Sequence, residues 1–153
     1  MNKATLLLVT AALFSATGCQ HLDKEVQPSS YDALALETGH WEWESTAYMA
    51  GKRTPATEGY SRQLVFGANG QVLIYHGSKL NKTTTYALSM GTSCANSQTQ
   101  VPIIAYETDS DVPNSDRKTY SLTKLPTGQS LSLVGEAVCL DVGAYEAYHW
   151  VKE

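Results

Sequence analysis

The sequence is poor in charge and in cysteine, and proline is scarce as well. Only 17% of its 153 residues are charged and 42% are hydrophobic, which is typical of a globular chain and not of a disordered one. Lysine and arginine total 11 against 15 acidic residues, and this excess of negative charge excludes a cation-rich surface for nucleic acid. The 5 prolines and 11 glycines are too few for a collagenous or low-complexity chain. At this length we expect one folded domain.

Motifs of the common enzyme classes are also missing. There is no Gly-x-Ser-x-Gly nucleophile elbow, no phosphate-binding loop and no glycine motif for dinucleotides. Glu42 and Glu44 stand two residues apart on an expected strand and share one face, which favours a solvated surface over an acid–base pair. We therefore expect a protein that is not an enzyme and that uses no cofactor.

Metal-binding patterns are equally weak. The four histidines are scattered, and no pair of histidines or cysteines has the spacing of a zinc site. Asp109, Asp111, Asn114 and Asp116 bring four carboxylate or amide side chains within eight residues, a spacing that calcium sites use, but the segment lacks the glycine and the final glutamate of an EF-hand. An ordinary solvated turn explains this composition better, so we predict no metal site.

The first 18 residues have the features of a secretory signal. A lysine precedes an apolar run over residues 4–15 that is too short to cross a bilayer as a mature helix. Residues 16–19, Ala-Thr-Gly-Cys, resemble the lipobox of bacterial lipoproteins. The resemblance implies that Cys19 is lipidated and becomes the new N-terminus. It also implies an anchor in the outer membrane of a bacterial envelope, because Gln20 stands where an Asp would indicate retention in the inner membrane. The alternatives are a plain signal before an ordinary cysteine and a core helix over residues 4–15.

Residues 19–38 are expected to form a tether. They are polar and contain Pro28 and two adjacent serines, a composition typical of linkers. Within this segment, Ser30 is placed to cap one or two helical turns. The folded domain is expected over residues 39–153.

From Gly39 onward, apolar and polar residues alternate, and no stretch of a dozen residues keeps helical spacing. This pattern indicates short β-strands separated by turns. Asn69 and Gly70 give the clearest hairpin signal, because this pair readily adopts the positive φ angles of a tight turn. The eight expected strands cover residues 40–49, 60–66, 71–76, 81–90, 100–107, 117–125, 129–134 and 145–152.

Eight antiparallel strands in sequence order, each with one apolar face, can close into a barrel or fold over as a sandwich. Closure removes the exposed sheet edges, and an eight-stranded interior is either filled by side chains or holds one small ligand. We therefore predict an all-β domain that forms an eight-stranded antiparallel up-and-down barrel.

Several short motifs occur in an order that resembles lipocalin-like domains. Gly39, His40 and Trp41 match the Gly-x-Trp start of lipocalins, in which the glycine turns the chain into the barrel and the tryptophan closes its bottom. The small lipocalin-like domains of bacterial lipoproteins carry further motifs in the same order. The resemblance covers about residues 39–152 and implies a calycin-type barrel that binds or carries a small hydrophobic ligand without chemistry. The further motifs here are Leu64-Val65-Phe66 with Gly70, Leu131-Ser132-Leu133, Cys139-Leu140-Asp141 with Gly143, and the aromatic residues Tyr145, Tyr148 and Trp150.

Nine tyrosines and three tryptophans favour a half-polar cavity, because aromatic rings with polar tips can grip an apolar ligand. The alternative is a filled barrel that acts as an interaction module, such as an envelope scaffold or inhibitor. Its loops over residues 51–59 and 108–116 would then bind a protein partner. The residues expected to line a cavity share the apolar faces of the first and fourth strands: Trp41, Trp43, Met49, Tyr86, Leu88 and Met90.

Cys94 and Cys139 are the only cysteines besides Cys19. In an oxidising periplasm such a pair indicates a disulfide, which would stabilise the fold by roughly 4 kcal/mol on the chain-entropy model. In a strict up-and-down order, however, the connections that hold the two cysteines lie at opposite ends of the barrel. Two buried free thiols are therefore the alternative.

Overall fold

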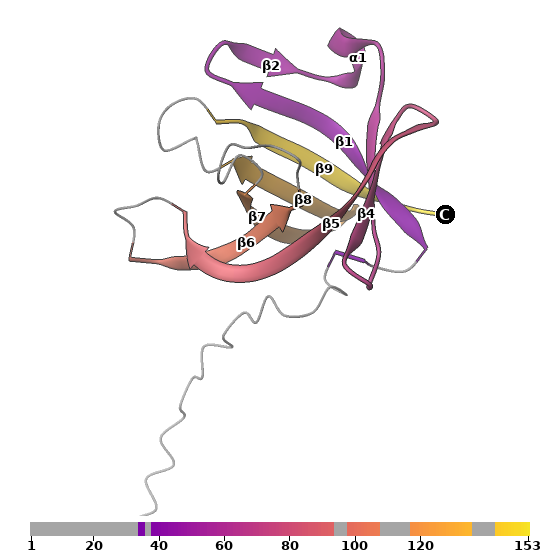
Figure 1. Ribbon diagram of the computed structural model, residues 1–153. Helices are drawn as coiled ribbons and strands as arrows, with labels where there is room; N and C mark the ends of the chain where they lie inside the picture. Colours follow the sequence, from indigo (N-terminus) through magenta and orange to yellow (C-terminus); the bar gives the residue numbers. More distant parts are fainter. Residues whose placement is uncertain (1–33, 36–37, 94–97, 108–116, 136–142) are drawn as a thin grey trace, which may run out of the picture.

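The structure is a computed structural model that describes residues 34–35, 38–93, 98–107, 117–135 and 143–153. The described chain is almost entirely β-structure, with one short helix, α1 (Pro55–Glu58). Figure 1 shows the strands wrapped around a common interior. The strands are β1 (Gly39–Tyr48), β2 (Gly51–Arg53), β3 (Arg62–Phe66), β4 (Gln71–His76), β5 (Lys79–Thr92), β6 (Gln100–Tyr106), β7 (Arg117–Leu125), β8 (Gly128–Gly135) and β9 (Tyr145–Lys152).

Pairing between the first and last barrel strands closes the sheet. Each strand from β3 to β9 pairs antiparallel with the next, and β1 pairs with both β3 and β9. The β1–β9 ladder runs from Gly39 opposite Lys152 to Ala47 opposite Tyr145. Within the described residues, eight strands thus form a closed antiparallel barrel in up-and-down order, which confirms the predicted fold and excludes the sandwich.

The eight strands predicted from the sequence correspond to β1 and to β3 through β9, and the expected hairpin turn is also confirmed. The backbone N–H of Gly70 donates to the carbonyl oxygen of Gly67 at 3.0 Å, and Gly70 has a φ of 79°. The Oδ1 atom of Asn69 accepts a hydrogen bond from the backbone N–H of Gln71 at 3.1 Å. Alternation along the chain thus located all eight strands of the barrel.

Between β1 and β3 the chain is more regular than its sequence indicates. β2 forms a hairpin with the end of β1, and α1 follows it. The helix starts with a capping box, because Thr54 and Thr57 each accept a hydrogen bond from the backbone N–H of the other through their hydroxyl oxygens. Gly59 ends it in the left-handed conformation, with a φ of 75°. Elements of three and four residues are too short for hydrophobic spacing to reveal.

A β-bulge in β1 interrupts its pairing with β9. Trp43 lies opposite Tyr148 and Ser45 lies opposite Ala147, so Glu44 is the extra residue between them. One extra residue reverses the alternation of the side chains that follow it.

Beyond this bulge, Thr46 continues the inward face and Ala47 does not. Thr46 lies opposite Glu146, and both are buried, whereas Ala47 lies opposite Tyr145, which is 53% exposed. The sequence analysis placed Met49 on the inward face, but this side chain is 80% exposed. The reversed alternation at the bulge and the end of β1 at residue 48 explain the difference.

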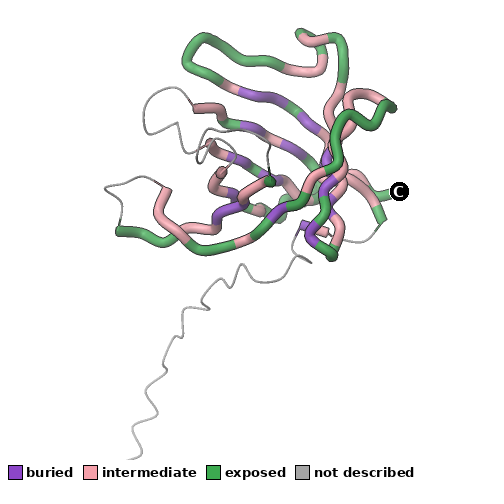
Figure 2. Tube along the Cα trace, viewed as in Figure 1, coloured by how far each residue is buried: buried purple, intermediate pink, exposed green. Residues whose placement is uncertain are grey.

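One part of the barrel interior is filled by apolar side chains. Figure 2 shows buried positions recurring along β1, β8 and β9. Trp41 is completely buried, and its indole N–H donates to the carbonyl oxygen of Leu34 at 2.9 Å. Its ring packs edge-on against that of Trp150, with 5.2 Å between the ring centroids. Leu34 is also fully buried, although it lies in the segment expected to be a tether. The core consists of Leu34, Trp41, Trp43, Leu64, Phe66, Val72, Tyr86, Ile104, Tyr120, Leu131, Leu133 and Tyr148.

Gly39 allows β1 to approach β9 closely. Its φ is 156°, and a Cβ atom at this position would lie 2.3 Å from the carbonyl oxygen of Val151 and 2.7 Å from the ring of Trp150. No side chain fits so close to backbone, so this position requires glycine.

Residues 1–33 and 36–37, which include the predicted signal, Cys19 and most of the predicted tether with its short helix, lie outside the described residues. In the part of the chain that the structure describes, no helix is long and apolar enough to span a membrane.

Candidate functional site

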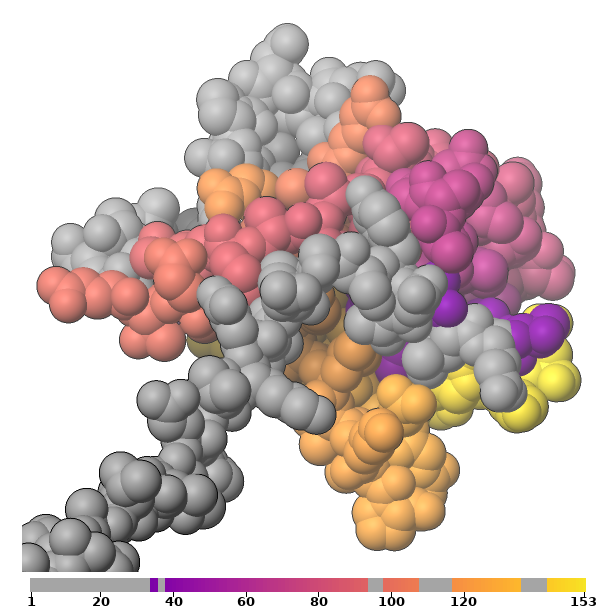
Figure 3. All heavy atoms as spheres, turned by 90° about the horizontal axis from the view of Figure 1, so that it is seen from below, coloured from indigo at the N-terminus to yellow at the C-terminus, as the bar shows by residue number. Residues whose placement is uncertain are grey.

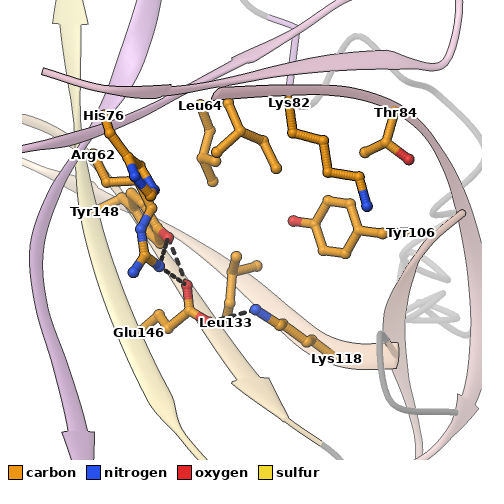
Figure 4. A pocket seen from close by; sticks show the side chains of 11 residues that line it. Arg62, Leu64, His76, Lys82, Thr84, Tyr106, Lys118, Leu133, Glu146 and Tyr148 are labelled. Carbon is orange, nitrogen blue, oxygen red and sulfur yellow. Dashed lines mark hydrogen bonds and ion pairs between the residues drawn. The ribbon is translucent and has the colours of Figure 1, made fainter. Parts of the chain in front are cut away.

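A cavity of about 220 Å³ lies inside the barrel (Figure 4). Every strand from β3 to β9 contributes at least one side chain to its wall. Residues two apart on a strand point to the same side, so pairs such as Arg62 and Leu64 line the cavity together. The lining residues are Arg62, Leu64, Ile74, His76, Lys82, Thr84, Tyr106, Lys118, Leu133, Glu146 and Tyr148.

Glu146 is the acidic side chain among these lining residues, and it is only 8% exposed. Its Oε2 atom accepts hydrogen bonds from Nη1 of Arg62 at 3.4 Å and from the hydroxyl of Tyr148 at 2.5 Å. Its Oε1 atom forms an ion pair with the ammonium group of Lys118. One buried carboxylate therefore connects β3, β7 and β9 (Figure 4).

Opposing effects act on the titration of Glu146. Burial raises the pKa of its carboxyl, but the charge and hydrogen bond of Lys118, the hydrogen bond of Tyr148 and the charge of Arg62 lower it more, so the pKa falls below its ordinary 4.5. The pKa of Tyr148 lies well above its ordinary 10.0, mainly because the phenol is buried and secondly because of the negative charge of Glu146. At neutral pH the carboxylate is therefore ionised, and the phenol keeps the proton that it donates.

Positive charge exceeds negative charge around the cavity. The described lining includes Arg62, Lys82 and Lys118 but only one carboxylate, that of Glu146, so the formal charge is 3 − 1 = +2 with His76 neutral. The whole chain carries a net charge of −4. The interior site is therefore opposite in sign to the protein as a whole.

Among the described residues, Lys82 has no ion pair or hydrogen bond. It lies opposite Ile74, whereas Leu80 lies opposite Tyr75, so Asn81 is the extra residue of a second bulge. Figure 4 shows the side chain of Lys82 pointing into the cavity.

The rest of the cavity wall is apolar. Leu64 and Leu133 are buried members of the core, and Ile74 and Tyr106 pack against it. A volume of about 220 Å³ lies below the ~300–1,000 Å³ of sites for drug-sized molecules. An apolar wall beside a charged one suits a small amphipathic molecule.

None of the six residues expected from the sequence to line a ligand cavity lines this one. Trp41, Trp43 and Tyr86 belong to the filled core, and Leu88 packs against it. The two methionines are more exposed: Met49 is 80% exposed and Met90 is 38% exposed.

The sequence analysis did not single out the charged residues that line the cavity, and the two charged strand residues that it considered, Glu42 and Glu44, were assigned to a solvated face. The positions of the lining residues nevertheless carry a signal. Arg62 stands two residues before the buried Leu64, and Glu146 stands two residues before the buried Tyr148. Because i and i+2 share a face, a charged residue in phase with buried neighbours points inward.

Two predicted sites lie outside the described residues: the lipidation site at Cys19 and the proposed disulfide between Cys94 and Cys139. The oxygen-rich residues 109–116, for which no metal site was predicted, also lie outside them. The described residues include no group of three or more His, Cys, Asp or Glu side chains that could hold a metal ion.

Comparison of the chain with protein-family models, with curated proteins and with solved structures found no match. The fold and the cavity are therefore the grounds for a functional assignment.

Proposed function

We propose that this protein binds a small, partly apolar ligand inside its barrel without chemistry, as a lipid-anchored lipoprotein of the bacterial envelope. The observation that carries the binding proposal is the cavity of about 220 Å³ beside the filled core. An eight-stranded barrel is just wide enough to hold one small ligand. The fold is compatible with lipocalin-like ligand binding.

The state of Glu146 supports binding over catalysis. A general base works best when its pKa lies near the operating pH. The contacts of Glu146 with Lys118, Tyr148 and Arg62 instead lower the pKa of its carboxyl, which makes the carboxylate a weak base. Its ion pairs hold Arg62 and Lys118 at the cavity.

Calorimetric titration with octanoate and with octanol tests the binding proposal. We expect saturable binding of at least one of them. Thr84→Phe should weaken it about tenfold or more, because the larger ring fills part of the cavity that Thr84 lines. Thr83→Phe is the matched control, because Thr83 is exposed and lies outside the cavity lining. Absence of saturable binding, or equal effects of the two variants, would contradict the proposal.

The envelope location is supported by the lipobox-like residues 16–19. Expression in a bacterial host with radiolabelled palmitate tests it. The wild-type chain should incorporate label and the Cys19→Ala variant should not. Equal labelling of both would contradict the lipid anchor.

A second function, binding of a protein partner, is favoured by one surface. β2 and α1, which occupy the loop 51–59 expected for this role, lie beside the end of β1 (Figure 1). Aromatic and apolar side chains are exposed there. Tyr48 is 42% exposed and Met49 80% exposed. Specific capture of one envelope protein by the wild type but not by Met49→Ser, with no ligand binding, would favour this function.

A further inference from the structure

The cavity holds more positive charge than its own carboxylate requires. Glu146 is already paired with Arg62 and Lys118, and it also accepts a hydrogen bond from Tyr148. Lys82 adds a third cation, and no described side chain pairs with it. Positive charges gathered in a concave site with low-dielectric walls attract an anion and raise its local concentration.

The side chains of Lys82 and Lys118 reach the same cavity. Lys82 comes from β5 and Lys118 from β7, and Figure 4 shows both side chains extending into the cavity from different walls. The ring of Tyr106 on β6 lies beside them, with the Lys118 ammonium 5.7 Å from its centroid. Leu133 and Ile74 supply apolar wall in the same cavity.

Resting on the proposed function, we infer that the ligand is an amphipathic oxyanion, with a carboxylate or a phosphate monoester at one end of a small apolar body. Lys82, assisted by Lys118 and Arg62, holds the charged end, and the apolar wall holds the body. Ammonium and guanidinium groups form charge-assisted hydrogen bonds with either oxyanion. The cluster already binds one carboxylate, that of Glu146.

Three probes with the same apolar chain separate the contributions: octanoate, octyl phosphate and octanol. Calorimetric titration of the full chain should show at least one of the two anions binding about tenfold or more tightly than octanol, the size of effect expected of a charge-assisted hydrogen bond. The tighter of the two anions identifies the charged group that the cavity prefers.

Lys82→Met removes the charge and keeps an unbranched apolar stem. It should weaken binding of the preferred anion about tenfold and leave octanol binding unchanged. Lys124→Met is the matched control, because it changes the net charge equally at an exposed site on β7 beside the β7–β8 hairpin, which projects from the domain (Figure 3). Lys82→Arg should retain most of the affinity.

Ionic strength gives a second measurement that needs no variant. Added sodium chloride should weaken binding of the anion by wild-type protein and leave octanol binding unchanged, because salt screens charge pairs at exposed side chains such as Lys82.

Octanol binding as tight as that of both anions, or equal anion affinities for Lys82→Met and Lys124→Met, would overturn this inference and leave the proposed function standing. No saturable binding of any of the three probes would contradict both.

Discussion

Arg62 on β3 reaches past β1 to Glu146 on β9, with 3.4 Å between Nη1 and Oε2. The two strands are not neighbours, because β1 lies between them in the sheet. The ion pair therefore crosses the interior of the barrel and does not run along its surface. With Lys118 on β7, it joins three strands to one buried carboxylate.

Replacing Glu146 by glutamine should destabilise the domain, because the neutral amide leaves Arg62 and Lys118 without their anionic partner. Breaking a buried pair costs about 3–5 kcal/mol, and the partial exposure of both cations reduces the expected loss to about 2 kcal/mol. Urea unfolding measures it. Glu44→Gln is the control, since this carboxylate is 52% exposed in its pair with His149 and should contribute under about 1 kcal/mol. Equal losses would contradict the prediction.

The lowered pKa of Glu146 predicts the pH dependence of this stabilisation. The folded carboxyl binds its proton more weakly than the unfolded one, so the stabilisation is complete above the ordinary pKa of 4.5 and is lost as pH falls through the lower folded pKa. Unfolding free energies of the wild type and Glu146→Gln should therefore converge as the pH drops from neutral into this acidic range. A difference that stays constant across the titration would contradict this origin of the stability.

Gly39→Ala should be strongly destabilising, because its Cβ would meet the carbonyl oxygen of Val151 at 2.3 Å. Gly128→Ala is a matched control: its φ of 143° is similarly unfavourable, but a Cβ there meets nothing within 4 Å. The control should lose about 1 kcal/mol from backbone strain alone, and Gly39→Ala at least about 2 kcal/mol more from the clash. Thermal unfolding compares them, and equal losses would show that the contact between β1 and β9 is not critical.

Leu34→Ala tests whether residues before the first strand belong to the folded domain. Leu34 is completely buried in the core and its carbonyl oxygen accepts from the indole of Trp41. Truncation of a buried leucine costs about 2–5 kcal/mol, so the midpoint of urea unfolding should drop clearly. Leu125→Ala, at a side chain that is 48% exposed, should have a much smaller effect. A midpoint for Leu34→Ala as high as that of the control would place Leu34 outside the core.

Thr46→Val tests the hydrogen bond between Trp43 and Thr46, which spans the bulge in β1. The indole N–H of Trp43 donates to Oγ1 of Thr46 at 2.9 Å, and both residues are buried. Valine keeps the shape but leaves the indole N–H without an acceptor, at a cost of about 1–3 kcal/mol, whereas Thr46→Ser retains the acceptor. Urea unfolding followed by tryptophan fluorescence should rank the serine variant above the valine variant. The reverse order would show that the hydrogen bond is not what stabilises this position.

Local alternation explains how much of the fold was predictable. The residues around Asn69 and Gly70 contain both the end of one strand and the start of the next, so the hairpin is visible in a short window. The candidate site was not predictable in this way. Its polar centre joins Arg62, Lys118 and Glu146, which are far apart along the chain and meet only when the barrel closes.

The alternation of apolar side chains was enough to locate the eight barrel strands and the buried side that they share, because alternation is a property of neighbouring residues. The set of charged residues that line the cavity was settled only when the barrel closed. That set depends on the register between distant strands and on the extra residues Glu44 and Asn81 in β1 and β5. A bulge reverses every later side chain of its strand, and its position is set by the pairing of the strands.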